Sequence, residues 1–107
     1  MTPSKYIIKP LANRKIHSFY DNVAKKYKHT YAFEDFARDV QNAVFGIYRI
    51  ENGLLRREPA LSRWRQKGYL MANTDKWYYA YTFDGETVTV VDACHAQNMR
   101  SSESSAK

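Results

Sequence analysis

The feature that most constrains this chain is the pair Asp84-Gly85, which lies between an aromatic strand-like run and a valine-rich one. An Asp-Gly pair in this setting is the strongest short-range signal for a β-hairpin, because a type I′ turn needs positive φ at both central residues. A two-residue turn here places Tyr79 opposite Val90 and Trp77 opposite Asp92. The sequence therefore predicts a hairpin with one fixed register.

Side chains alternate along the two strands and divide this hairpin into two faces. One face is apolar and is the predicted core face, formed by Tyr79, Tyr81, Phe83, Val88 and Val90. Asp92 falls on the same face, where an unpaired carboxylate is costly, so we expect it to be paired or to mark the sheet edge. The other face is rich in threonine, is free to meet solvent or a ligand, and carries His95 at the end of the sheet.

The N-terminal half predicts one strand and two helices. An apolar run over residues 6–9, closed by Pro10, predicts a strand that leads into a helix. A helix over residues 11–28 is then predicted from apolar residues that recur at intervals of three and four on one face, namely Ile16, Phe19, Tyr20, Val23 and Tyr27. The same spacing of apolar residues, from Phe33 to Ile47, predicts a second helix that Thr30 can cap, so that only His29 and Thr30 separate the two helices. A connection this short is typical of an antiparallel helical hairpin.

The segment between the second helix and the C-terminal hairpin is harder to assign. Residues 54–67 are predicted to be irregular, since Pro59 interrupts them, and residues 68–74 are predicted to form a strand. The fold class is therefore α+β, with a mostly antiparallel sheet in the order strand, helix, helix, strand, strand, strand. Residues 1–100 are expected to form one domain, and residues 101–107 a polar, disordered tail.

Composition suggests an anionic partner and a reducing compartment. The 107 residues carry a formal net charge of +6, which favours nucleic acid or an acidic protein segment but also fits a plain soluble surface. The single cysteine, Cys94, excludes an internal disulfide. Neither a signal-peptide core nor a membrane-spanning apolar run is present, so a cytoplasmic protein without a membrane partner is expected.

The order of elements resembles the RelE/ParE superfamily of bacterial toxins. The resemblance covers about residues 5–100, and its main carrier is the run over residues 76–95, Lys-Trp-Tyr-Tyr-Ala-Tyr-Thr-Phe-Asp-Gly-Glu-Thr-Val-Thr-Val-Val-Asp-Ala-Cys-His. It implies a twisted sheet packed on two N-terminal helices, and a cognate antitoxin protein as partner. It also implies one of two activities: cleavage of mRNA at the ribosome, as in RelE-like members, or non-enzymatic poisoning of DNA gyrase, as in ParE-like members.

At three positions this chain differs from RelE-like nucleases, and these differences bear on the choice between mRNA cleavage and gyrase binding. RelE-like nucleases often carry an arginine where this chain has Tyr78, and basic residues where it has Tyr69 and Met71. If this chain cleaves RNA, it therefore does so with a different set of catalytic side chains. A non-enzymatic binder, or a homologue that has lost its catalytic set, is the alternative.

His95 is the leading candidate for chemistry, because its ordinary pKa lies close to neutral pH. With Arg65, Gln97 and Asn98 it forms the candidate catalytic set, in which the side chains orient a ribose 2′-hydroxyl and take its proton. The alternative is that His95 is merely a polar residue at a strand end. The nearby Asp92 and Cys94 supply too few ligands for a metal, so no metal or cofactor is expected.

A basic segment upstream is the candidate nucleic-acid-binding strip, because arginine forks suit phosphate oxygens and aromatic rings stack on splayed bases. Its members, with the strand residue Tyr78, are Arg56, Arg57, Arg63, Trp64 and Lys67. The strip would equally hold an acidic antitoxin peptide. Trp64 also fits a core aromatic with the arginines solvated around it, and Tyr78 also fits simple packing within the sheet.

Overall fold

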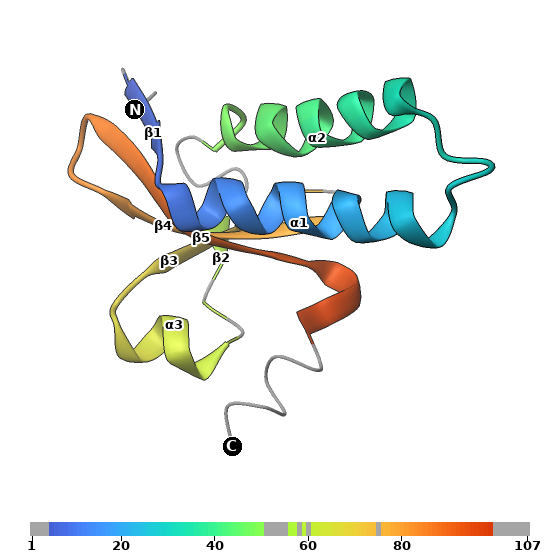
Figure 1. Cartoon of the computed structure of the whole chain (residues 1–107). Coiled ribbons are helices and arrows are strands. Elements are labelled where there is room, and N and C mark those ends of the chain that lie inside the picture. Colours follow the sequence, from blue (N-terminus) through green and yellow to red (C-terminus); the bar gives the residue numbers. More distant parts are fainter. Residues whose placement is uncertain (1–4, 51–55, 58, 60, 75, 100–107) are drawn as a thin grey trace.

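Two long helices cover one face of a mixed sheet, and a short third helix covers the other face (Figure 1). The computed structural model describes residues 5–50, 56–57, 59, 61–74 and 76–99. Its helices are α1 (Pro10–Lys26), α2 (Phe33–Ile47) and α3 (Ser62–Gln66), and its strands are β1 (Lys5–Ile8), β2 (Arg56–Arg57), β3 (Leu70–Asn73), β4 (Trp77–Phe83) and β5 (Thr87–His95). The predicted tail over residues 101–107 lies outside the described part.

The sheet has five strands in the order β1-β5-β4-β3-β2. The β1–β5 pair is parallel, and the other three pairs are antiparallel. The predicted α+β class and the mostly antiparallel sheet are therefore confirmed. The prediction of an irregular segment over residues 54–67 was wrong in its described part, which holds β2 and α3.

Helix α1 packs on the sheet through the face that the spacing predicts. Ala12, Ile16 and Tyr20 recur every four residues and are buried, while Pro10 occupies the first helical turn, where its missing N–H costs nothing. Tyr27 was expected on this face as well. It is 50% exposed, because the helix ends at Lys26 and the chain turns away from the sheet.

The start of α2 differs from the prediction that Thr30 caps it. The Thr30 hydroxyl donates to the Tyr27 carbonyl at 3.4 Å and so belongs to the preceding turn. The orphan N–H of Ala32 donates instead to the Asp35 carboxylate at 3.0 Å. This acidic residue in the first turn also interacts favourably with the helix dipole. The hydrogen bond with Ala32 and the neighbouring Arg38 lower the pKa of Asp35.

Gly46 lets α2 approach the sheet closely. A Cβ at this position would lie 2.8 Å from the Tyr79 hydroxyl oxygen and 3.0 Å from the Thr74 side chain. Tyr79 is fully buried and donates to the Ala43 carbonyl, so its ring has no room to yield. Burial also raises the pKa of Tyr79 to about 12, which keeps its hydroxyl protonated as a donor.

Replacing Gly46 with alanine is expected to lower the free energy of unfolding by about 1–2 kcal/mol. Overpacking of a core destabilises a protein by about 1–3 kcal/mol. The higher helix propensity of alanine stabilises the helix and offsets only part of this loss. Urea denaturation followed by far-UV circular dichroism measures the change. Gln41→Ala, on the exposed side of the same helix, should leave stability unchanged, and a Gly46→Ala protein as stable as the wild type would contradict the close approach.

The hairpin forms at the predicted place but in a different register. Phe83 pairs with Val88 and Tyr81 with Val90, whereas an irregularity between Ala80 and Tyr81 then shifts the pairing by one further residue. Beyond it Ala80 pairs with Asp92 and Trp77 with His95. The predicted Trp77–Asp92 and Tyr79–Val90 pairs were therefore wrong for two reasons. Beside the turn, Tyr81 already pairs with Val90, two residues further along β5 than the predicted register places it, and the bulge then adds one unpaired residue in β5.

This bulge exchanges the faces at the end of β5. Asp92 and Cys94 now belong with the α3 side of the sheet, whereas His95 lies on the α1 side with its ring stacked on Phe19. The prediction that His95 shares the threonine-rich face was wrong for this reason. Of the predicted core face, Tyr79, Tyr81, Val88 and Val90 are buried, but Phe83 is exposed beside the turn.

Helix α3 builds a second, smaller core beneath the sheet. Leu61 and Trp64 are each 1% exposed and pack on Met71, Ala80 and Cys94. The helix ends at Gln66, and Gly68, directly after the C-cap residue Lys67, has a φ of 75° that suits the left-handed position of a helix C-terminus. In this cap the Tyr69 N–H donates back to the Trp64 carbonyl at 3.1 Å.

Candidate functional site

Asp92 is a buried carboxylate that joins three elements. Its side chain accepts from the Trp64 indole N–H at 2.9 Å and forms an ion pair with Lys15 at 2.7 Å. It also accepts from the Ala93 N–H at 2.8 Å, and Arg63 Nε lies 3.9 Å away. The expectation that Asp92 is paired is confirmed. Because Lys15 belongs to α1 and Trp64 to α3, this carboxylate links the helices on opposite faces of the sheet.

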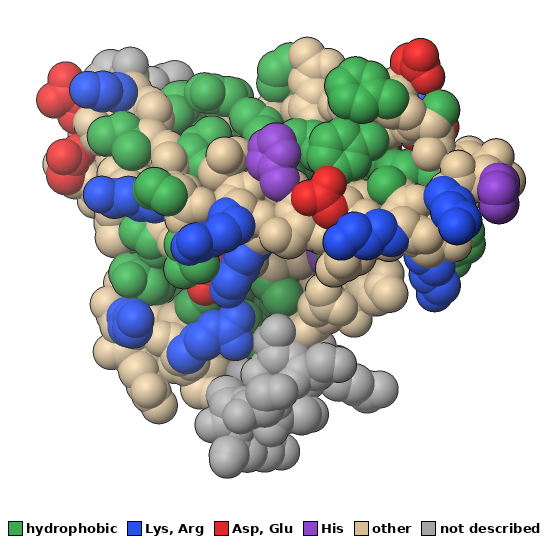
Figure 2. Space-filling model, in the orientation of Figure 1, with side chains coloured by type: hydrophobic (Ala, Val, Ile, Leu, Met, Phe, Trp, Pro, Cys, Tyr) green, Lys and Arg blue, Asp and Glu red, His purple; other side chains and the backbone are tan. Residues whose placement is uncertain are grey.

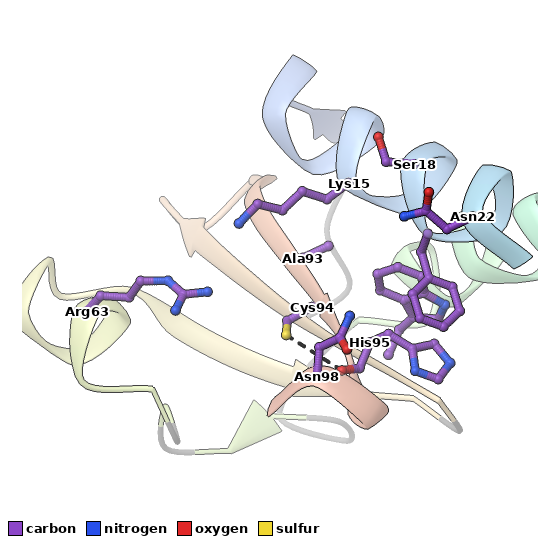
Figure 3. A pocket seen from close by; sticks show the side chains of 10 residues that line it. Lys15, Ser18, Asn22, Arg63, Ala93, Cys94, His95 and Asn98 are labelled. Atoms are coloured by element: carbon purple, nitrogen blue, oxygen red, sulfur yellow. Dashed lines mark hydrogen bonds between the residues drawn. The ribbon is translucent and has the colours of Figure 1, made fainter. Parts of the chain in front are cut away.

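A cleft of about 260 Å³ opens beside this network. It lies between α1, the end of β5 and the helical turn over residues 96–99. In Figure 3, Arg63 lies at one end and His95 at the other, Lys15 and Asn22 reach in from α1, and Asn98 comes from the C-terminal turn. Two cations share one buried carboxylate, so the cleft retains net positive charge for an anion. Figure 2 shows Lys and Arg side chains gathered along α1 and below it.

His95 is held as a neutral ring. Burial lowers its pKa, and the nearby Lys76 adds to the shift. The ring stacks on Phe19 with centroids 4.0 Å apart and meets Trp77 edge-on at 5.3 Å. Nδ1 accepts the Gln97 N–H at 3.0 Å, so the proton of the neutral ring sits on Nε2. In this state the ring offers a hydrogen-bond donor at Nε2.

Stability should depend on pH through His95. Because its pKa is lower in the folded protein, the unfolded chain binds more protons, and stability falls as pH drops below the ordinary histidine pKa of about 6.5. We expect the free energy of unfolding to fall more between pH 7.5 and pH 5.0 in the wild type than in a His95→Gln variant. Urea titrations at the two pH values measure this difference. His17 and His29 remain in both proteins, so parallel losses in the two would contradict the assignment.

The cleft gathers only part of the predicted catalytic set. His95 and Asn98 line it, and Gln97 is exposed and contributes its backbone N–H to the ring of His95. Arg65 does not line it. Its guanidinium is exposed on α3 and donates to the Pro59 carbonyl at 2.8 Å.

The residues of the predicted nucleic-acid-binding strip are likewise not all in the cleft. Arg63 lines the cleft, whereas Lys67 lies beyond the end of α3 and is exposed. Arg56 and Arg57 form β2 at the edge of the sheet, and their side chains lie outside what the structure describes.

The two aromatic residues that were predicted to contact nucleic acid pack inside the protein. Trp64 is 1% exposed and bonded to Asp92, so it cannot stack on a base, and the alternative of a core aromatic is confirmed. Tyr78 is half-buried and packs on the core cluster around Trp64. Packing explains it without a ligand.

Sequence reasoning missed the contribution of α1 to the cleft. Lys15, Ser18 and Asn22 lie on one side of this helix at spacings of three and four, next to Phe19. Their spacing marks a shared polar face. Only the contact of that face with the end of β5 makes it part of a site, and nothing in the local sequence encodes this contact.

No protein-family model matches the sequence, and no curated protein or solved structure matches the chain. Within the described residues, no helix has the length and apolar character needed to cross a membrane.

Proposed function

We propose that the protein binds single-stranded RNA in the cleft beside β5 and cleaves it, as a RelE-like toxin component of a toxin–antitoxin module acting on mRNA at the ribosome. The observation that carries this proposal is the meeting of His95 and Asn98 with the cations Lys15 and Arg63 in one cleft. Cleavage through a ribose 2′-hydroxyl needs little more than positioned polar groups, a proton acceptor and positive charge around the phosphorane.

The cations would bind the phosphate. Lys15 and Arg63 each keep donors beyond the one that faces Asp92, and arginine in particular presents a fork of N–H groups that matches phosphate oxygens. Asp92 keeps both side chains in place, so they lose little freedom when a phosphate arrives. The buried carboxylate therefore acts as a positioning group for the phosphate site.

His95 would act on the scissile nucleotide. In the tautomer present here, its Nε2–H donates to a phosphate oxygen. In the other tautomer, Nδ1 carries the proton, the contact with the Gln97 N–H is given up, and Nε2 accepts the proton of the 2′-hydroxyl. The 2′-oxygen then attacks the phosphorus and the bond to the 5′-oxygen of the next nucleotide breaks. That oxygen takes up a proton from water and the His95 imidazolium returns its extra proton to the solvent, which yields a 2′,3′-cyclic phosphate and a 5′-hydroxyl end.

The second candidate function is a non-enzymatic ParE-like gyrase binder or a homologue without catalysis. One observation favours it: the positions where RelE-like nucleases are basic hold Met71, which is 3% exposed, and Tyr78, which packs on the α3 core. Both sites are used for packing. A binder of this class would still use the basic cleft to hold an anionic surface.

A cognate antitoxin remains part of both proposals. Large apolar side chains are exposed on α2 and directly after it, among them Phe33 at 78%, Phe45 at 53% and the C-cap residue Tyr48 at 51%. Apolar side chains exposed along one helix favour a protein partner over bulk solvent.

The test uses the purified protein and an mRNA with a labelled 5′ end, with and without ribosomes. We expect new 3′ ends carrying a 2′,3′-cyclic phosphate when ribosomes are present. A folded protein that produces no cleavage in either mixture, but binds gyrase and blocks its supercoiling activity, would support the second candidate instead.

A further inference from the structure

A second, smaller hollow adjoins the RNA cleft. It has a volume of about 110 Å³ and lies between α1, α2 and the start of β4. Its polar side chains include Asp39 and Asn42 from α2 and Lys76 from the β3–β4 connection. The proposed cleavage mechanism uses none of these three groups.

Trp77 connects the two hollows, because it lines both of them. Its ring lies 5.3 Å from His95 on the side of the cleft and 6.0 Å from Tyr20 on the side of the small hollow, measured between ring centroids. A strand of RNA whose phosphate lies in the cleft therefore has a neighbouring base within reach of the second hollow.

The polar groups of this hollow are available to a ligand. One oxygen of Asp39, Oδ2, accepts from the Tyr31 hydroxyl at 2.6 Å, while Oδ1 lies 4.0 Å from Arg38 Nε and accepts no hydrogen bond from a described residue. Asn42 is exposed, and its amide makes no hydrogen bond within the described part of the chain. The Lys76 side chain is also exposed and forms no ion pair with a described residue.

We propose that this hollow is a base-reading pocket that prefers a base with an exocyclic amino group. The inference rests on the proposed RNA function. Amides and carboxylates are among the side-chain groups that read base edges, and in single strands these edges are open to contact. Asn42 can donate and accept, so it fits several bases. Asp39 can only accept, so it favours the amino group of cytosine and disfavours the carbonyl oxygen of uracil.

The test compares oligo-C and oligo-U of equal length, because these pyrimidines differ in the edge that Asp39 would read. Fluorescence anisotropy at low salt measures binding, with 2′-O-methyl RNA to prevent cleavage. We expect oligo-C to bind at least about fivefold more tightly than oligo-U, as one good base contact allows. In Asp39→Asn the ratio should fall to within about twofold, since an amide also donates to the uracil carbonyl.

Asp21→Asn is the matched control, because it removes the same charge from an exposed position on α1 that lines neither hollow. It should keep the wild-type preference. Equal binding of the two RNAs by the wild type, or a preference that survives Asp39→Asn, would overturn the base-reading pocket and leave the RNA cleft intact. A folded protein that binds neither RNA would overturn the proposed RNA function, and this inference with it.

Discussion

Asp92→Ala is expected to lower the free energy of unfolding by about 2–4 kcal/mol, the range for a buried polar network that loses its shared partner. The substitution leaves the Trp64 indole N–H without an acceptor inside the core, where that ring is 1% exposed. It also breaks the ion pair with Lys15, which joins α1 to the end of β5. Urea denaturation followed by tryptophan fluorescence and far-UV circular dichroism measures the loss.

Two further variants show whether the loss comes from the network. Asp92→Asn keeps an oxygen that can accept from Trp64 but removes the charge, so it should destabilise the protein less than Asp92→Ala. Asp21→Ala removes an exposed carboxylate from α1 and should change stability by less than about 0.5 kcal/mol. If Asp92→Ala unfolds at the same urea concentration as the wild type, Asp92 does not join the two faces.

His95→Ala is expected to reduce RNA cleavage by about 100-fold or more, the usual effect of removing a group that transfers or donates a proton in the transition state. The side chain lines the cleft together with Lys15, Arg63 and Asn98. RNA binding should weaken much less, because the phosphate contacts of the two cations remain. Cleavage rates at saturating ribosome concentration, together with binding constants for uncleavable RNA, separate the two effects.

His29→Ala is the matched control for this prediction. His29 is exposed in the turn after α1 and does not line the cleft. Its removal should leave the rate unchanged. A His95→Ala protein that cleaves as fast as the wild type while unfolding normally would assign the chemistry to another group.

Local periodicity was sufficient to predict most of the elements of this fold. The helical spacing of Ile16 and Tyr20 predicts the buried face of α1, and the aromatic and valine-rich runs around Asp84-Gly85 predict the hairpin. Each of these signals arises from side chains on one element that meet one continuous core. Helix α3 was missed because it has only five residues, Ser62–Gln66, too few to show a period.

The site was harder to predict because it depends on one irregularity and one long-range contact. The bulge in β5 places His95 on the α1 side of the sheet and Asp92 next to Trp64. No Gly or Pro in the sequence marks the position of this bulge. Lys15 then meets Asp92 across most of the chain length. Trp64 shows the same limit, since its basic sequence context left both a base-stacking ring and a core aromatic open, and only the tertiary packing shows that the ring is buried.

The most direct test of the central claim is to map mRNA 5′ ends in a bacterial host after induced expression of the wild-type chain and of His95→Ala. The proposed function predicts growth arrest by the wild type, with new 5′ ends inside translated reading frames that the variant does not produce at equal protein levels. Growth arrest with unchanged mRNA ends and a DNA-damage response, or no arrest from a soluble folded product, would contradict a ribosome-dependent nuclease and favour a non-enzymatic binding protein.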